Sequence, residues 1–170
     1  MILRDAGSDD APAIAAIYAH HVLTGTATFD TEPPSSDAWR AKVLDMRNRG
    51  WPMIVAEREG EVVGYAYAAQ FRDRPAYAAT CENSIYVAPD ALGAGIGTAL
   101  LRRLLVRACQ AGFEQMIAVI GGGEPASVAL HAREGFVHAG RMRDVGRKFG
   151  RSLDTVYMQR ALVASGSSTR

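Results

Sequence analysis

Three glycines alternate just before a predicted helix in the middle of the chain. β-Branched and aromatic residues at 85–87 predict a strand, which should end before Pro89 because proline cannot donate a hydrogen bond to a sheet. From Ile96 onward, apolar residues recur with the 3.6-residue period of a helix. Glycines at the start of a helix let the backbone approach a ligand and leave the first helix amides unpaired, which suits a phosphate. Tight packing of strand against helix would use glycine in the same way at Gly93, Gly95 and Gly97.

The glycine turn differs from two familiar phosphate-binding sequences. It lacks the Gly-Lys-Ser/Thr of a triphosphate loop, and its G-x-G-x-G spacing lacks the third glycine of a dinucleotide fingerprint. It also lies late in the chain, whereas a dinucleotide fold places its glycine turn after the first strand.

Glu82 lies inside an otherwise apolar stretch at 77–87 that predicts a long central strand. The two-residue alternation of a strand puts Glu82 on the face of Ser84 and Tyr86, and Cys81 on the opposite face. A carboxylate in such a strand is either a hydrogen-bonded structural group or a base whose pKa burial raises. Cys81 is expected to be a packed thiol and not a nucleophile.

His131, Ser127 and two arginines are further candidates for a polar site. His131 falls in a short predicted helix at 126–133, where it is either a packed or solvated helix residue or an acid. Ser127 begins that helix and can serve as its cap. Arg72 and Arg74 precede the strand of Glu82; exposed arginines are commonly only solvated, but a guanidinium fork suits a carboxylate or phosphinate.

Strands and helices alternate along the chain in an order that predicts an α/β fold. Strands are expected at 2–5, 53–57, 62–70, 77–87, 116–120, 136–139 and 155–159, and helices from Ser8, over 36–48, from Ile96 and over 126–133. The strands at 53–57 and 62–70 read as an antiparallel hairpin. The basic segment 141–151, which contains glycine, is predicted to be a mobile loop between the last two strands.

The loop at 24–34 contains one large apolar residue, Phe29. It either anchors the loop in the core or forms a wall of a binding site, and we favour the wall. His20 and His21 fall near the end of the first helix, where they are expected to be capping or surface residues.

Composition restricts the class of protein. A chain of 170 residues with a net charge of +1 predicts one domain with a small-molecule partner and no nucleic acid. The two cysteines give neither a disulfide framework nor zinc spacing, so no metal is expected. No apolar stretch is long enough to cross a bilayer, which excludes a membrane partner and favours a cytoplasmic protein. We expect the domain to cover residues 1–162 and the tail 163–170 to be disordered.

The combination of a mixed sheet, a Gly-x-Gly-x-Gly helix start after the fourth strand and a short helix ending in Gly-Phe resembles the GNAT superfamily of N-acetyltransferases. Within it, the chain resembles the phosphinothricin and methionine sulfoximine N-acetyltransferase branch over residues 1–162. The resemblance is carried by five segments in order: TFDTEPPS, AEREGEVVGYAYAAQFRDRPAY, CENSIYV, AVIGGGEPAS and SVALHAREGF. It implies the GNAT fold, a mostly antiparallel central sheet with flanking helices, and a homodimer as the common assembly.

The resemblance also implies roles for individual residues. The pyrophosphate of acetyl-CoA would be bound by the backbone amides of Gly93, Ala94, Gly95, Ile96, Gly97 and Thr98, and the pantetheine arm by the main chain of Val87 and by Ser127. Glu82 matches the general base, and His131 the residue with acid or orienting duty. One of the two arginines would hold the substrate, in a site lined by Phe29, Arg72, Arg74 and Tyr77.

Two departures from the family pattern, at three positions, are visible in the sequence. The family usually begins the glycine turn with Gln or Arg and carries a basic residue inside it, where this chain has Leu92 and Ala94. The branch tends to have Asn at the position of Glu124, so that contact with the coenzyme arm is in doubt.

The expected activity is acetyl transfer from acetyl-CoA to the α-amine of phosphinothricin, methionine sulfoximine or methionine sulfone. Direct attack within a ternary complex needs the fewest groups, because no covalent acetyl-enzyme is required. Two other functions stay open: an acetyltransferase for a protein N-terminus or lysine, and a non-catalytic acyl-CoA-binding module.

Overall fold

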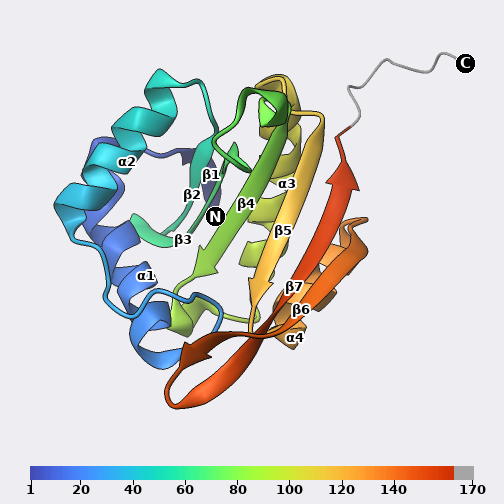
Figure 1. The fold of residues 1–170 in the computed structure, drawn as a ribbon. Helices are drawn as coiled ribbons and strands as arrows, with labels where there is room; N and C mark the ends of the chain where they lie inside the picture. The colour runs from blue at the N-terminus through green and yellow to red at the C-terminus, as the bar shows by residue number, and fades with distance from the viewer. Residues whose placement is uncertain (163–170) are drawn as a thin grey trace, which may run out of the picture.

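Seven strands form one mixed sheet in the computed structural model, which describes residues 1–162 (Figure 1). The predicted tail at 163–170 lies outside the described residues. The spatial order is β1-β2-β3-β4-β5-β7-β6, and every neighbouring pair is antiparallel except β4 and β5. The predicted α/β class and mostly antiparallel sheet are confirmed. The strands are β1 (Ile2–Asp5), β2 (Met53–Arg58), β3 (Glu61–Gln70), β4 (Thr80–Val87), β5 (Gln115–Gly121), β6 (Val137–Lys148) and β7 (Arg151–Ala161).

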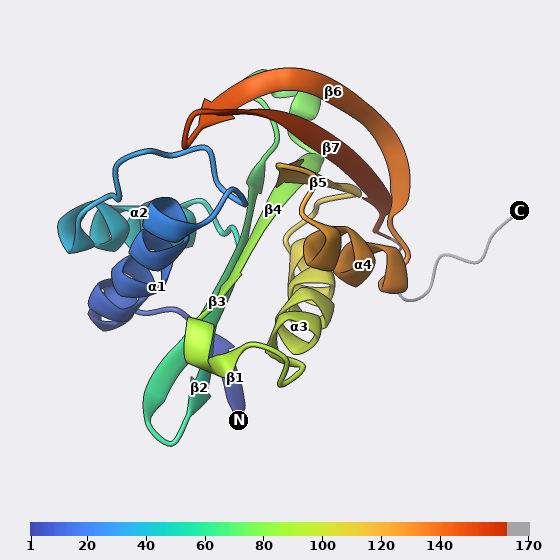
Figure 2. The ribbon, with the colours of Figure 1, turned by 90° about the horizontal axis from the view of Figure 1, so that it is seen from below.

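Two pairs of helices cover the two faces of the sheet (Figure 2). One face carries α1 (Ala11–Thr24) and α2 (Ser36–Asn48), and the other carries α3 (Ile96–Gln110) and α4 (Pro125–Arg133). The α2 helix begins where the Ser35 hydroxyl accepts a hydrogen bond from the Ala38 amide at 3.2 Å.

Each face has its own apolar core, as the helical periodicities predict. Aromatic side chains dominate the first core, which includes Tyr18, Trp39, Tyr65 and the apolar stripe of α1. Aliphatic side chains dominate the second, in which the leucines of α3 pack on the sheet.

The predicted start of the central strand at residue 77 was wrong by three residues. Pro75–Tyr77 form a turn of 3-10 helix, and β4 begins only at Thr80. The fixed φ of Pro75 suits the first position of a helical turn, which the Tyr77 amide closes by donating to the Arg74 carbonyl at 2.9 Å.

The predicted mobile loop at 141–151 was also wrong. Most of the segment belongs to the long hairpin of β6 and β7, which turns at Phe149 and Gly150, both with positive φ. β6 is an edge strand, exposed along most of its length, and its register shifts twice. An exposed, irregular strand shows no apolar alternation, so its sequence reads as a loop.

The parallel strands β4 and β5 separate along their length, which Figure 1 shows at their C-terminal ends. Their pairing ends at Asn83 and Ala118, while β5 stays paired with β7 as far as Gly121. Along β4, the N–H and C=O groups of successive residues point alternately toward β3 and toward β5. Those of Thr80 and Ala88 form hydrogen bonds on the β3 side. The backbone groups of Ile85 and Val87 therefore point into the opening beside β5.

Candidate active site

A cavity of about 690 Å³ occupies the opening between β4 and β5, a volume typical of small-molecule sites. Its wall includes α1, the loop that follows α1, the glycine turn and the start of α4. Ten of the predicted site residues line it: Phe29, Glu82, Val87, Gly93, Gly95, Ile96, Gly97, Thr98, Ser127 and His131.

The glycine turn has the conformation that an anion site needs. Gly93 and Gly95 both have φ of 76°, which favours glycine, and no atom lies within 4 Å of the Cβ that either could carry. Tight packing therefore does not explain these two glycines, whereas the shape of the turn does. The first bond of α3 runs from the Ala99 amide to the Gly95 carbonyl at 3.1 Å, so the amides at 96–98 have no partner within the helix. Ala94 is exposed and does not line the cavity.

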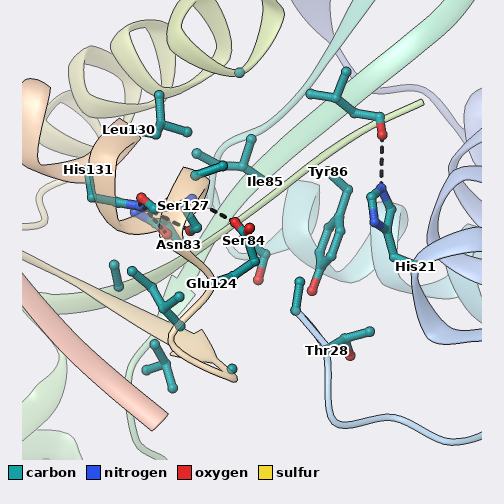
Figure 3. Close-up of a pocket in the computed structure, with 18 of the residues that line it drawn as sticks. His21, Thr28, Asn83, Ser84, Ile85, Tyr86, Glu124, Ser127, Leu130 and His131 are labelled. Atoms are coloured by element: carbon teal, nitrogen blue, oxygen red, sulfur yellow. Dashed lines mark hydrogen bonds between the residues drawn. The ribbon is translucent and has the colours of Figure 1, made fainter. Parts of the chain in front are cut away.

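His21 contacts the open edge of β4. Its Nε2 donates a hydrogen bond to the Val87 carbonyl at 2.9 Å, and its ring lines the cavity (Figure 3). The prediction of a capping or surface role was wrong for His21, because the last turn of α1 faces the sheet at this point. The Val87 carbonyl thus has a partner within the chain, and the groups left open on this edge are the Val87 amide and the Ile85 backbone.

Glu82 is a half-buried carboxylate on the cavity wall. Its side chain is 33% exposed, and no described residue donates a hydrogen bond to it, so Glu82 is not the hydrogen-bonded structural carboxylate of the first alternative. Arg72 Nη1 lies 3.9 Å from Glu82 Oε2. Burial raises the pKa of Glu82 above the ordinary value, and the nearby charges of Arg72 and Lys42 offset part of that rise.

Only one of the two predicted arginines reaches Glu82. Arg72 extends toward the carboxylate and lies over the ring of Phe71 at 4.1 Å. Arg74 immediately precedes the 3-10 helix, and neither arginine lines the cavity. Tyr77 does not line it either; its ring contacts Phe71 instead, with centroids 5.7 Å apart.

Phe29 both anchors its loop and forms part of the wall. Its ring lies against Gly121 and Gly146, so closely that a Cβ added at Gly146 would overlap the ring. The neighbouring Thr28 is tied on two sides. Its hydroxyl bonds to Tyr18 Oη at 2.7 Å, and its carbonyl accepts from the buried Lys148 Nζ at 2.9 Å. The α1–α2 loop is thus fixed to the β6–β7 hairpin.

The last turn of α4 brings His131 to the closed end of the cavity. Glu124 caps this helix, since its carboxylate accepts from the Ser127 amide at 2.8 Å, so Ser127 is not the cap (Figure 3). His131 is 4% exposed, with Nδ1 2.8 Å from the Ser127 carbonyl and Nε2 3.2 Å from Asn83 Oδ1. Burial lowers the pKa of His131, partly offset by the Ser127 carbonyl. Burial also raises the pKa of Cys81 to about 12, which fits a packed thiol.

Several residues of the site were not foreseen. Lys42 donates to Tyr67 Oη at 2.7 Å, and Tyr67 lies opposite Ser84 in the sheet, on the wall that holds Glu82. Strand alternation could have found Asn83, because the neighbour of Glu82 must face the other side. Nothing in the sequence indicated that Lys42 lies near the site, because lysines are common on exposed helix faces.

Within residues 1–162, no three His, Cys, Asp or Glu side chains gather as they would around a metal ion. No helix in the described part of the chain has both the length and the apolar character needed to cross a membrane.

Comparison with known proteins gives consistent results in sequence and in structure. The chain is 50% identical to the phosphinothricin N-acetyltransferase of Alcaligenes faecalis over 98% of its length and 84% of the relative's. It is 43% identical to the L-methionine sulfoximine/L-methionine sulfone acetyltransferase of Pseudomonas aeruginosa over 92% of both chains. The crystal structure of a phosphinothricin acetyltransferase from Sinorhizobium meliloti in complex with AcCoA matches with a TM-score of 0.93 and 47% identity, covering 99% of this chain and 91% of that one.

Residues 14–136 match the description "Acetyltransferase (GNAT) family", a span that includes the glycine turn, Glu82 and His131. The predicted family and branch resemblance are confirmed. The sheet order, the glycine turn and these relatives together place the chain in the GNAT acetyltransferase family.

Proposed function

We propose that this acetyltransferase moves the acetyl group of acetyl-CoA to the α-amine of a small amino-acid analogue such as phosphinothricin, methionine sulfoximine or methionine sulfone. The names of its relatives support this class of acceptor. The observation that carries the proposal is Glu82, a hydrogen-bond-free carboxylate with a raised pKa in a cavity that also contains the glycine turn.

The cavity fits the shape and charge of acetyl-CoA, which would supply an activated acetyl thioester. The left-handed glycines and the free amides at 96–98 suit its pyrophosphate, with Gly93, Ala94, Gly95, Ile96, Gly97 and Thr98 as the predicted binding segment. The open backbone of Ile85 and Val87 suits the amides of a pantetheine arm. Ser127 lies on the wall of the same cavity. The amide contacts do not depend on the side chains at Leu92 and Ala94.

Glu82 would take a proton from the substrate ammonium, directly or through a water, because only the free amine can attack a thioester. Attack forms the C–N bond, collapse of the adduct breaks the C–S bond, and the second proton that the nitrogen loses goes to the departing CoA thiolate. A raised pKa makes the carboxylate a stronger base than an ordinary glutamate, and Arg72 keeps enough of it ionised to act. Both substrates would be bound together, so that positioning supplies much of the rate.

Arg72 is the better candidate for the substrate carboxylate or phosphinate. Like Arg74 and Tyr77, it lies outside the cavity lining, but of the three only Arg72 contacts Glu82, at 3.9 Å. Lys42 adds a second positive charge near Glu82. Phe29 offers an apolar surface beside the amine site, which suits the hydrocarbon part of an amino-acid analogue.

We also propose a homodimer in the cytoplasm. The edge strand β6 presents unpaired backbone groups and exposed apolar side chains at Val137, Met142 and Val145, which would pair or pack well with a second copy. The absence of a disulfide between Cys81 and Cys109 fits a reducing compartment. Light scattering after gel filtration tests the assembly: the wild type should elute as a dimer and Val145→Lys as a monomer. A monomeric wild type would overturn this part of the proposal.

Thiol release from acetyl-CoA tests the activity. Purified protein would be assayed against phosphinothricin, methionine sulfoximine, methionine sulfone, ordinary amino acids and a lysine peptide. Release with the sulfur or phosphorus analogues supports the proposal. Release only with the peptide would make the chain a peptide acetyltransferase, and binding of acetyl-CoA without release would make it a non-catalytic module.

A further inference from the structure

Asn83 occupies the closed end of the cavity, where the pairing of β4 with β5 stops. Its side chain is 6% exposed and lies on the face opposite that of Glu82, toward α4. Its Oδ1 lies 3.2 Å from His131 Nε2, and its Nδ2 is buried without a partner among the described residues. A buried amide nitrogen without an acceptor is unfavourable, so this arrangement needs an explanation.

The surroundings of His131 fix where its proton lies. The Ser127 carbonyl can only accept a hydrogen bond, so the 2.8 Å contact requires a proton on His131 Nδ1. Burial favours the neutral imidazole, and a neutral ring with its proton on Nδ1 has a lone pair on Nε2. A lone pair facing Asn83 Oδ1 would bring two acceptors together. The ring itself is held edge-on against Phe136, with centroids 4.9 Å apart, so it cannot turn away.

The Asn83 carboxamide can satisfy both forms of His131 by rotating half a turn. With Oδ1 toward Nε2, it accepts from an imidazolium that carries protons on both nitrogens. With Nδ2 toward Nε2, it donates to the neutral ring, and the nitrogen gains its acceptor. Oδ1 then takes the place where Nδ2 had no partner, and a buried carbonyl without a donor is more often tolerated than a buried N–H without an acceptor. The second orientation matches the neutral ring that burial favours.

We propose that Asn83 is a positioning residue for His131: its carboxamide donates to Nε2 and holds the imidazole in the tautomer that keeps its proton on Nδ1. In that tautomer neither ring nitrogen has a proton free for a leaving thiolate, because the one on Nδ1 is used by the Ser127 carbonyl. His131 then has an orienting duty. It links Ser127 of α4 to Asn83 of β4 across the closed end of the cavity. This inference rests on the proposed function for its bearing on catalysis.

The charged groups on the elements around His131 are largely engaged elsewhere. On α4, Glu124 caps the helix and Arg133 is exposed. Glu134 is held by Arg102 of α3 at 2.9 Å, and Arg160 of β7 donates to the Glu134 carbonyl. On β4, Glu82 faces the other side of the sheet. Asn83 is therefore the polar group best placed to set the state of Nε2.

The first test is nitrogen-15 NMR of the histidine rings in the free wild-type protein. The chain has four histidines, and the His131 signals are identified by their loss in His131→Gln. We expect a protonated Nδ1 and an unprotonated Nε2 near pH 7. A proton on Nε2 in place of Nδ1 would overturn the proposal.

Two variants change the partner of Nε2 while keeping the size of the side chain. Asn83→Asp offers a carboxylate, which should hold a second proton on His131 and raise its titration midpoint by about one pH unit or more. Asn83→Leu offers no donor, and the His131 tautomer should become mixed. Asn48→Asp, at the exposed end of α2, is the matched control and should leave the His131 spectrum unchanged. Unchanged His131 spectra in both Asn83 variants would contradict the proposal. If Asn83→Leu does not fold, the wild type and Asn83→Asp still decide.

Thiol release separates positioning from a merely structural role. In Asn83→Leu we expect kcat to fall about tenfold or more, with KM for acetyl-CoA within about twofold of the wild type. A lower melting temperature with an unchanged His131 titration would show a structural role only, against the proposal. If the wild type releases no thiol with any amine, the proposed function fails, while the NMR result for Asn83 remains decisive.

Discussion

Glu82 and Asn83 are consecutive in β4, and their side chains lie on opposite faces of the sheet at the point where β4 and β5 separate. One faces Arg72 and the aromatic core, and the other faces His131 and α4. A one-residue slip in the register of β4 would exchange them. The pairing of β4 with β3 therefore determines which side chain faces Arg72 and which faces His131 of α4.

Glu82→Gln should abolish most of the activity and leave acetyl-CoA binding intact. Glutamine keeps the shape of the side chain but cannot take a proton, and loss of a general base reduces rates by about 10²- to 10⁴-fold. Thiol release gives kcat, and calorimetry gives the affinity for acetyl-CoA. Glu61→Gln, at the exposed start of β3, is the control. Equal activity in Glu82→Gln and the wild type would remove Glu82 from the mechanism.

The pH dependence of kcat/KM should reveal the raised pKa of Glu82. The carboxylate must be ionised to act, so activity should rise with pH through a limb that lies above the ordinary value of 4.5. The charge of Arg72 lowers this pKa, so the limb should move to higher pH in Arg72→Ala. Profiles of both proteins with the same amine cancel the ionisation of the substrate. A limb at or below pH 4.5 would contradict burial as the dominant effect.

Arg72→Ala should raise KM for the amino-acid substrate by about tenfold. This is the lower end of the range expected for losing a hydrogen bond to a charged group, because the Arg72 side chain is half exposed and solvent screens its charge. Arg74→Ala is the matched control and should stay within about twofold, because of the two arginines only Arg72 lies within 4 Å of Glu82. Steady-state kinetics with saturating acetyl-CoA measures both. The reverse order of effects would move the substrate clamp to Arg74.

Gly95→Ala should weaken acetyl-CoA binding and lower stability. An alanine at φ of 76° costs about 1–2 kcal/mol, or roughly 2–8 °C in melting temperature for a chain of this size. Relief of that strain would turn the amides away from the pyrophosphate. Gly60→Ala has the same backbone problem at φ of 85° in the distant β2–β3 turn, so it should lose stability without a change in KM for acetyl-CoA. Equal KM values in the two variants would count against the anion site.

Gly146→Ala should displace Phe29, because the new methyl group would overlap the ring. Because the Phe29 ring is exposed and can turn aside, the free energy of unfolding should fall by about 1 kcal/mol or less, the low end for overpacking, and loss of the Phe29 wall should lower kcat/KM for the amine. Gly140→Ala in the same strand has no atom within 4 Å and should change neither quantity. Denaturant titration and steady-state kinetics test the pair. An intact kcat/KM in Gly146→Ala would limit Phe29 to anchoring its loop.

The sequence predicted the elements whose local pattern is strong. The apolar period of α3, the left-handed glycines before it and the buried strand of Glu82 all have local causes that a reader can find in the residues. The β6–β7 hairpin was not predicted at its full length, because an exposed edge strand has no apolar alternation. The places of His21 and Lys42 in the site were not predicted, because their partners, the Val87 carbonyl and Tyr67, lie 66 and 25 residues away in the chain. Contacts of that kind depend on the tertiary fold and leave no local pattern.

The separation of β4 from β5 divides the sheet into two groups of strands. The first contains β1 to β4 and the second β5 to β7. They are joined by the pairing of β4 with β5, which consists of four aligned residue pairs from Thr80 with Gln115 to Asn83 with Ala118. A ligand that forms hydrogen bonds with both parts adds to the few interactions that join them. By mass action, such a ligand at a hundred times its Kd stabilises the fold by about 2.7 kcal/mol. While it is bound, acetyl-CoA would therefore be part of what holds the sheet together.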